Sequence, residues 1–239
     1  GQAMVGLGDY GEAATMFGRA EDIYPRYQLE TGPYREQGWV GAYNDAIAPL
    51  NAGDLERAAE IFEMGNAIYS ERPEALLQLG SIYSRLNQVD LSAERFQDAM
   101  DILEGTRETQ MLDTANAETW VQHWDIATMG LGQALTFAER YQEAADLYGR
   151  LLEDSPENTS LVGSLAGVLS ELGQADSVRV LYDELLSRPG LSERDLFNAG
   201  VGLYQIDNWE GAAQAFSAAA APNPFNRAAP LTLAQPYTT

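Results

Sequence analysis

DNWEGAAQAF, residues 207–216, is a polar turn followed by a small residue, Ala212, and by an aromatic residue, Phe216, four positions later. Four residues make about one helical turn, so both side chains lie on one helix face, and the small one leaves room for the ring to pack on a neighbouring helix. The same spacing occurs at five earlier pairs: Ala13/Phe17, Ala58/Phe62, Ser92/Phe96, Ala144/Tyr148 and Val178/Tyr182. This pattern predicts a series of helices packed against one another.

The six pairs recur with a regular period. The intervals between them are 45, 34, 52, 34 and 34 residues. Three of these intervals equal the period of a two-helix repeat, and the other two are that period plus an insertion. Such self-similarity predicts a stacked array of helical hairpins with a core that continues from one repeat to the next.

A helix-loop-helix signature precedes most of the pairs. It is clearest in Leu79-Gly80 with Tyr83, and in Leu131-Gly132 ahead of Tyr141. These motifs resemble the tetratricopeptide repeat, whose 34-residue unit has Leu-Gly and then Tyr on its first helix, Ala, Phe and Ala on its second, and Pro near its end. The resemblance is good over residues 191–224 and 125–158 and weaker over 159–192. It implies an all-α fold, a right-handed superhelical array of about six hairpins, or α-solenoid.

The repeat pattern also predicts boundaries. We expect a single array over residues 1–239, consisting of a half unit 1–25, an insertion 26–36, units 39–72 and 73–104, an insertion 105–122, units 125–158, 159–190 and 191–224, and a partial seventh unit 225–239. Because Gly1 falls in the middle of a first helix, we expect a fragment of a longer bacterial protein. Gly32-Pro33 predicts a turn, and Pro49 argues against a regular last turn in the helix that contains it.

The charge balance is strongly acidic. The chain has 36 acidic and 14 basic residues, all 14 of them arginine, for a formal net charge of −22. A nucleic-acid-binding surface needs Lys or Arg to displace counterions from phosphates, so this composition argues against such a role. The surface is either simply solvated, as in salt-adapted proteins, or it attracts a basic partner.

Residues for catalysis, metal binding or cofactor binding do not come together in the sequence. There is no cysteine, and His123 is the single histidine. A lone histidine lacks the convergent partners that a catalytic or metal site requires. The glycines are scattered over repeat positions and form no phosphate-binding run. We therefore expect no enzymatic activity, no cofactor and no metal. With no run of 18 apolar residues, the sequence also predicts no transmembrane helix.

The resemblance implies a concave groove lined by the first helix of each hairpin, which in this family usually holds a peptide or a partner helix. Its positions here are mostly apolar or aromatic: Val40, Tyr43, Asn44, Ile47, Leu77, Arg85, Met129, Gln133, Phe137, Phe197, Val201 and Tyr204. Each could instead complete the packing between helices. Members that bind acidic C-terminal tails use a clamp of Lys, Arg and Asn. Because only isolated side chains such as Arg194 and Asn198 stand nearby, that ligand is disfavoured.

The two insertions form a second candidate interface. Insertions in repeat proteins project from one edge and often carry specific contacts. The candidate residues are Tyr27, Tyr34, Met111, Trp120 and Trp124. The alternative is that the insertions only lengthen a helix pair.

These features together predict a non-enzymatic scaffold that binds a partner protein or peptide within a larger assembly. Two alternatives stay open: the regulatory or substrate-presenting part of a larger enzyme or sensor, and an array that associates with itself through its ends. The lysine-free composition and the many Tyr and Gln residues favour an extracytoplasmic bacterial protein, with the cytoplasm as the alternative.

Overall fold

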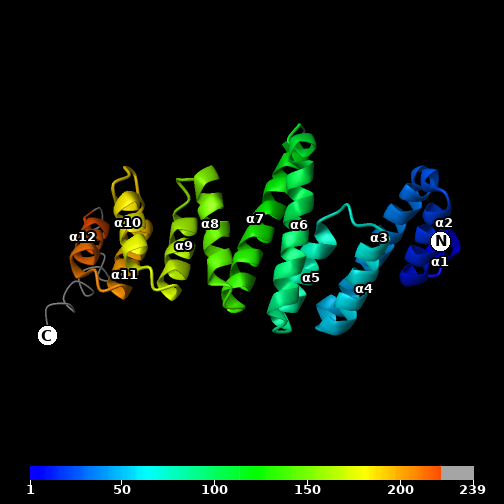
Figure 1. Ribbon diagram of the computed structural model, residues 1–239, viewed down its shortest axis with the longest axis horizontal. Coiled ribbons are helices and arrows are strands. Elements are labelled where there is room, and N and C mark those ends of the chain that lie inside the picture. Colours follow the sequence, from blue (N-terminus) through cyan, green and yellow to red (C-terminus); the bar gives the residue numbers. More distant parts are fainter. Residues whose placement is uncertain (113, 222–239) are drawn as a thin grey trace. The chain divides into compact units, whose positions relative to one another are not determined.

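The computed structural model describes residues 1–112 and 114–221, and in this part of the chain the secondary structure is helical throughout (Figure 1). The elements are α1 (Gln2–Gly6), α2 (Tyr10–Ile23), a 3-10 turn η1 (Pro25–Tyr27), α3 (Gln28–Ala52), α4 (Leu55–Ile68), α5 (Glu74–Arg85), α6 (Val89–Gln110), α7 (Thr114–Phe137), α8 (Tyr141–Asp154), α9 (Thr159–Glu171), α10 (Ala175–Leu186), α11 (Glu193–Gln205) and α12 (Trp209–Ala220). The expected all-α fold is confirmed. None of these helices combines the length and the apolar character needed to cross a bilayer.

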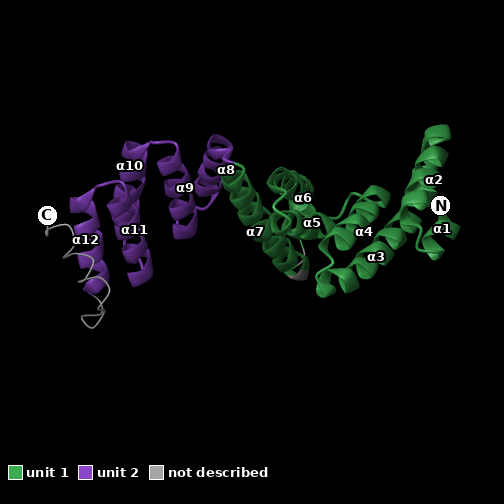
Figure 2. Cartoon of the chain, turned by 90° about the horizontal axis from the view of Figure 1, so that it is seen from below, with its two compact units in different colours: residues 1–138 green, residues 139–239 purple. Residues whose placement is uncertain are grey.

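The chain divides into two compact units, Gly1–Ala138 and Glu139–Thr239, shown in different colours in Figure 2. In unit 1, α3 packs on α4, α5 on α6, and α6 on α7. In unit 2, α8 packs on α9, α9 on α10 and α11, and α11 on α12. The division falls in the turn between α7 and α8, inside the repeat expected over residues 125–158. The partial seventh unit expected over 225–239 lies outside the described residues.

All six small–aromatic pairs are buried, and the aromatic side chains are at most 6% exposed. Phe96 shows how the pairs are used. Its ring lies against Gly80 on α5, where a Cβ atom would come within 2.8 Å of three ring atoms. Ser92, the small partner, donates a 2.8 Å hydrogen bond to the Gly80 carbonyl. The glycine of the Leu-Gly signature is therefore the surface on which the aromatic ring of the second helix packs.

The turn between the two helices of each hairpin has the same backbone conformation in all six hairpins. One residue in each turn has a positive φ: Gly8, Gly53, Asn87, Glu139, Gly173 and Asp207. These residues repeat at the intervals of the aromatic pairs, each nine positions before the ring. The next residue caps the second helix, and Asp9, Asp54 and Asn208 do so with a side-chain oxygen. The phase of the repeat is thus fixed by backbone geometry as well as by packing.

The turn expected at Gly32-Pro33 is absent, and that prediction was wrong. Helix α3 continues through both Pro33 and Pro49. A proline inside a helix removes one backbone hydrogen bond and crowds the preceding turn. On either side of Pro33 the helix is held to α2, because Thr31 before the proline and Arg35 after it both donate hydrogen bonds to Glu21. These contacts keep the segment helical.

Both insertions lengthen helices. Residues 28–36 form the first turns of α3, residues 105–110 the last turns of α6, and residues 114–122 the first turns of α7. Helices α6 and α7 lie side by side along their length, as the two long green ribbons of Figure 1 show. The insertions therefore lengthen helices, and the interface expected on their side chains stays a prediction.

Candidate functional site

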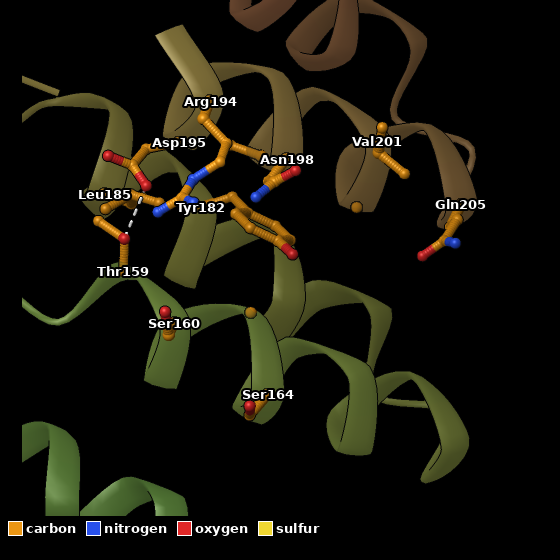
Figure 3. Close-up of a pocket in the computed structure, with 13 residues that line it drawn as sticks. Thr159, Ser160, Ser164, Tyr182, Leu185, Arg194, Asp195, Asn198, Val201 and Gln205 are labelled. Carbon is orange, nitrogen blue, oxygen red and sulfur yellow. Dashed lines mark hydrogen bonds between the residues drawn. The ribbon is translucent and has the colours of Figure 1, made fainter. Parts of the chain in front are cut away.

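A pocket of about 600 Å³ opens in unit 2 between α9 and α11, with α10 behind it (Figure 3). Helix α9 contributes Thr159, Ser160, Gly163 and Ser164 to its wall. Helix α11 contributes Arg194, Asp195, Asn198, Ala199, Val201, Gly202 and Gln205, and α10 contributes Tyr182 and Leu185. Since α9 and α11 are the first helices of successive hairpins, this pocket lies on the side of unit 2 where the groove was expected.

The part of the pocket wall that α9 forms is polar and carries only short side chains. Asn158 begins the helix by accepting hydrogen bonds from the backbone N–H groups of Ser160 and Leu161, at 3.1 and 3.3 Å. One turn later stands Gly163, which is exposed and has no atom within 4 Å of the place where a Cβ would lie. A ligand can therefore approach the backbone of α9 closely at this point.

The α11 wall is held in place by Asp195. This residue and Ser192 form a capping box, in which the Ser192 hydroxyl accepts from the Asp195 N–H at 3.1 Å and Asp195 Oδ2 accepts from the Ser192 N–H at 3.2 Å. The Ser192 hydroxyl also donates to Asp195 Oδ2 at 2.6 Å. The other carboxylate oxygen accepts a 2.7 Å hydrogen bond from Thr159 on α9. Hydrogen bonds from Ser192 and then from Thr159 hold the pKa of Asp195 below its usual value. The carboxylate is thus ionised and tied to both helices.

Tyr182 presents an unpartnered hydroxyl to the pocket. Its side chain is 6% exposed, and its ring packs so closely on Gly202 that a Cβ there would collide with the hydroxyl oxygen. Figure 3 shows the hydroxyl pointing into the space between Ser164 and the side chains of α11. In the described part of the chain this hydroxyl makes no hydrogen bond. Burial raises the pKa of Tyr182, which keeps the group a neutral donor.

Arg194 and Asn198 stand one helical turn apart on α11 and line the same pocket. In Figure 3 the Arg194 side chain extends across the Asp195 side of the pocket, with Asn198 beside it. Arg194 forms no salt bridge with any described residue and interacts electrostatically with Asp195. The pocket therefore offers a guanidinium, an amide and several hydroxyls to a polar ligand.

The predicted groove residues fall into different environments. Val201 lines the pocket. Phe197 and Tyr204 are half-buried on α11, Phe197 with its ring 5.4 Å from that of Phe216 and Tyr204 with its ring 4.7 Å from that of Trp209. In unit 1, Leu77 is 4% exposed and belongs to the core, and Tyr43 and Ile47 are half-buried. The exposed members of the set are Val40, Asn44, Arg85, Met129, Gln133 and Phe137.

The predicted insertion residues are also divided between surface and core. Tyr27, Tyr34 and Met111 are each 41% exposed. Trp120 is buried, donates a 2.8 Å hydrogen bond from Nε1 to the Leu103 carbonyl, and stacks on Trp124 with 5.1 Å between ring centroids. The tryptophan pair therefore joins α7 to α6, and the tyrosines and Met111 are the accessible part of the set.

Sequence reasoning missed three of the pocket's polar side chains. Arg194 and Asn198 were treated as isolated, although their four-residue spacing puts them on one helix face. Tyr182 was assigned to the core by the small–aromatic pattern, which indicates where the ring packs and not where the hydroxyl ends.

Within residues 1–112 and 114–221, no group of three or more His, Asp or Glu side chains has an arrangement that could hold a metal ion.

Residues 138–190 match a family model described as tetratricopeptide repeat. This segment of the chain is similar to the tetratricopeptide repeat. The matched segment covers α8, α9 and α10. Among curated proteins there is no match.

Several solved structures share the fold of this chain. The crystal structure of YrrB, described as a TPR protein with an unusual peptide-binding site, is 16% identical, with 86% of this chain and 96% of that one covered and a TM-score of 0.52. MamA 41-end from Desulfovibrio magneticus RS-1 is 13% identical, covering 86% and 98%, with a TM-score of 0.53. PilW, a type IV pilus biogenesis factor, is 18% identical, covering 95% and 98%, with a TM-score of 0.51. At these identities the likeness shows the fold alone.

Proposed function

We propose that the chain is a non-enzymatic protein–protein interaction scaffold and that its unit 2 pocket binds an extended segment of a partner polypeptide. The observation that carries this proposal is the Tyr182 hydroxyl, which has no hydrogen-bond partner among the described residues and is directed into a pocket of about 600 Å³. The hydroxyl of a tyrosine whose ring is buried usually has a hydrogen-bond partner, so at the wall of a pocket it is available to bind a ligand. A peptide carbonyl would accept this hydrogen bond.

The chemistry of the walls favours an extended backbone over a helix. A helix satisfies its own N–H and C=O groups, whereas an extended segment presents them to its surroundings. Asn198 and Gln205 can both donate to a peptide carbonyl and accept from a peptide N–H, and Arg194 adds further donors. Because Gly163 has no side chain, the partner polypeptide can approach the backbone of α9 closely at this position. A peptide-binding site is named in the description of YrrB, which supports this use of the fold.

The proposal extends to the exposed residues of the groove and insertions in unit 1. Large apolar side chains are accessible there, with Met129 61% exposed and Phe137 71% exposed on α7. Exposed apolar surface of this kind marks places where proteins meet. We place a second contact with partner proteins on these side chains, on Val40 of α3 and on Tyr27, Tyr34 and Met111 of the insertions, which fits a role within a larger assembly.

Two glycines of α9 provide a matched test. Gly163 lines the pocket, and Gly167 lies one turn further along the helix, also exposed and with no atom within 4 Å of a Cβ position, but not among the pocket's lining residues. Peptides selected on the full chain from a random twelve-residue display library would be measured against Gly163→Leu and Gly167→Leu. We expect Gly163→Leu to abolish binding and Gly167→Leu to preserve it.

Tyr182→Phe adds a second readout because it removes only the hydroxyl. We expect peptide binding to weaken about fivefold to tenfold, the value of one hydrogen bond of about 1 kcal/mol or slightly more. Equal affinity in the parent, Gly163→Leu and Tyr182→Phe proteins would contradict the assignment of the peptide site to this pocket.

A further inference from the structure

A second pocket, of about 400 Å³, lies in unit 1 where the two insertions meet. Glu36, from the first insertion, lines it from α3. Gln110 at the end of α6 and Trp120 on α7 line it from the second insertion. The floor is the connection between α4 and α5, from Glu71 to Glu74. Segments that break the repeat period at two distant places in the sequence thus contribute to one cavity, apart from the unit 2 pocket.

The pocket carries an excess of negative charge. Three carboxylates line it, from Glu36, Glu71 and Glu74, and the single arginine is Arg72. Arg72 is already engaged, with Nη2 3.0 Å from Glu74 Oε1, Nη1 3.6 Å from Glu36 Oε1, and its guanidinium 4.4 Å from the centre of the Trp39 ring. Two formal negative charges remain unbalanced when His123, which also lines the pocket, is neutral.

Glu74 is the residue whose bonding is incomplete. Its Oε1 accepts the hydrogen bond from Arg72, but its Oε2 is buried and has no hydrogen-bond partner among the described residues. A buried carboxylate oxygen without a donor is costly, and each such atom in a native protein needs an explanation. A cationic donor in the pocket would provide the missing bond when the Glu74 carboxylate, whose side chain is 24% exposed, turns toward it.

Apolar side chains line part of the pocket. Ile102 and Leu103 on α6 and Trp120 on α7 do so, among polar side chains of the same two helices. The Trp120 ring is held by its hydrogen bond to the Leu103 carbonyl, so the wall is fixed. A cavity lined both by carboxylates and by aliphatic and aromatic carbon matches a side chain with a hydrocarbon stem and a charged head.

From these observations we infer that the unit 1 pocket receives an arginine or lysine side chain of a partner protein. The stem lies along Ile102, Leu103 and Trp120, and the head donates to Glu74 Oε2 and to Glu71. The charge of the whole chain supports this choice of occupant, because a net charge of −22 attracts a basic surface and speeds its approach. The inference does not depend on peptide binding in unit 2.

The test uses capped pentapeptides, Ala-Ala-X-Ala-Ala, in which X is arginine, lysine or the neutral arginine analogue citrulline. Each peptide is titrated into the full chain in 150 mM NaCl, where the field of distant surface charges is largely screened. The readout is the indole ¹H–¹⁵N resonance of Trp120 in the pocket wall. We expect the arginine and lysine peptides to shift this resonance saturably and the citrulline peptide to leave it unchanged.

Two glutamate variants distinguish binding in the pocket from attraction by the net negative charge of the chain. Glu74→Gln keeps the shape of the side chain and removes its charge, and Glu94→Gln removes the same charge from an exposed position on α6 outside the pocket. We expect Glu74→Gln to weaken the arginine peptide about tenfold, the value of a charge-assisted hydrogen bond, and Glu94→Gln to change it by less than about twofold. Glu71→Gln, at an exposed position, serves if Glu74→Gln does not fold.

The inference is overturned by any of three results: no saturable shift of Trp120, equal binding of the citrulline peptide, or equal weakening by Glu94→Gln and by the pocket variants. Because the readout and the variants belong to unit 1, failure here leaves the unit 2 peptide site unaffected, and the reverse also holds.

Discussion

The hydroxyl of Thr159 donates a 2.7 Å hydrogen bond to Asp195, a residue 36 positions further along the chain. The bond joins the first turn of α9 to the first turn of α11. The same carboxylate closes the capping box of α11 through Ser192. One side chain therefore starts a helix and also fixes that helix against the equivalent helix of the preceding repeat.

Removing this link should destabilise unit 2. We expect Thr159→Val to lower the free energy of unfolding by about 1 kcal/mol, the net value of one hydrogen bond, as measured by urea denaturation at pH 7. Ser160→Ala, at an exposed neighbouring position, is the control and should have little effect. An equal loss of unfolding free energy in the two variants would show that the hydrogen bond between Thr159 and Asp195 does not stabilise unit 2.

The same carboxylate predicts a pH dependence. The folded-state pKa of Asp195 is lowered, so its contribution to stability is present above the unfolded-state pKa of about 3.9 and is lost as the pH falls through the folded-state pKa. Thr159→Val removes part of this shift. The difference in stability between parent and Thr159→Val proteins should therefore shrink between pH 5 and pH 2, and a constant difference would contradict the assignment.

The contact between Phe96 and Gly80 predicts a coupled pair of mutations. Phe96→Ala should cost roughly 3–5 kcal/mol because it leaves a cavity in the stack. Gly80→Ala should also destabilise, since its new Cβ would lie 2.8 Å from the Phe96 ring. In a double-mutant cycle with Phe96→Leu, the smaller leucine side chain should reduce the destabilisation caused by Gly80→Ala. Additive losses would mean that the two sites do not interact.

A buried ion pair fixes the first insertion. Arg35 Nη2 lies 2.8 Å from Glu21 Oε2, with the two side chains 17% and 12% exposed, and Arg35 Nη1 donates to the Ile68 carbonyl. Glu21→Gln should destabilise unit 1 by about 2 kcal/mol, because it leaves the guanidinium without its charged partner. Glu60→Gln, which removes an exposed pair with Arg57, should cost less than about 0.5 kcal/mol in thermal unfolding.

Unit 1 contains a tyrosine that should titrate late. Burial, and then the hydrogen bond that its hydroxyl donates to Glu63 at 2.9 Å, raise the pKa of Tyr83 to about 12. Because the folded pKa is raised, its contribution to stability is complete below the unfolded pKa of about 10 and is lost as the pH rises toward 12. Tyr83→Phe should remove one late phase from the tyrosinate absorbance titration and reduce the loss of stability above pH 10. An unchanged late phase would assign it to other tyrosines.

The fold was predictable because its signal is local and repeated. Each small–aromatic pair reports a packing contact within one hairpin or its neighbour, and all six aromatic rings are buried as the pattern requires. The turn predicted at Gly32-Pro33 was wrong because the contacts that keep this segment helical are not encoded in the neighbouring residues. The contacts that hold α3 straight there come from Glu21 on another helix, and a pattern of single residues does not show such pairing.

The pockets were harder to predict than the fold. The positions expected to face the groove were taken from the repeat, but Leu77 points into the core and Val201 is the one predicted residue that lines the unit 2 pocket. What defines that pocket is the meeting of Arg194, Asn198 and the Tyr182 hydroxyl, which come from two helices. Likewise, the unit 1 pocket depends on the lengths of α3, α6 and α7. These lengths could not be predicted from the presence of the insertions in the sequence.

The left-handed residue that recurs nine positions before each aromatic ring makes the array modular. Glu139 and Gly173 are 34 positions apart, as are Gly173 and Asp207, so each 34-residue segment begins and ends at a residue with a positive φ. Such a segment can be duplicated or removed without changing the geometry of any turn. Array length can therefore change in evolution or by design without new turn geometry, whereas the unit 2 pocket is kept only where these two segments stay adjacent, because its walls come from both of them.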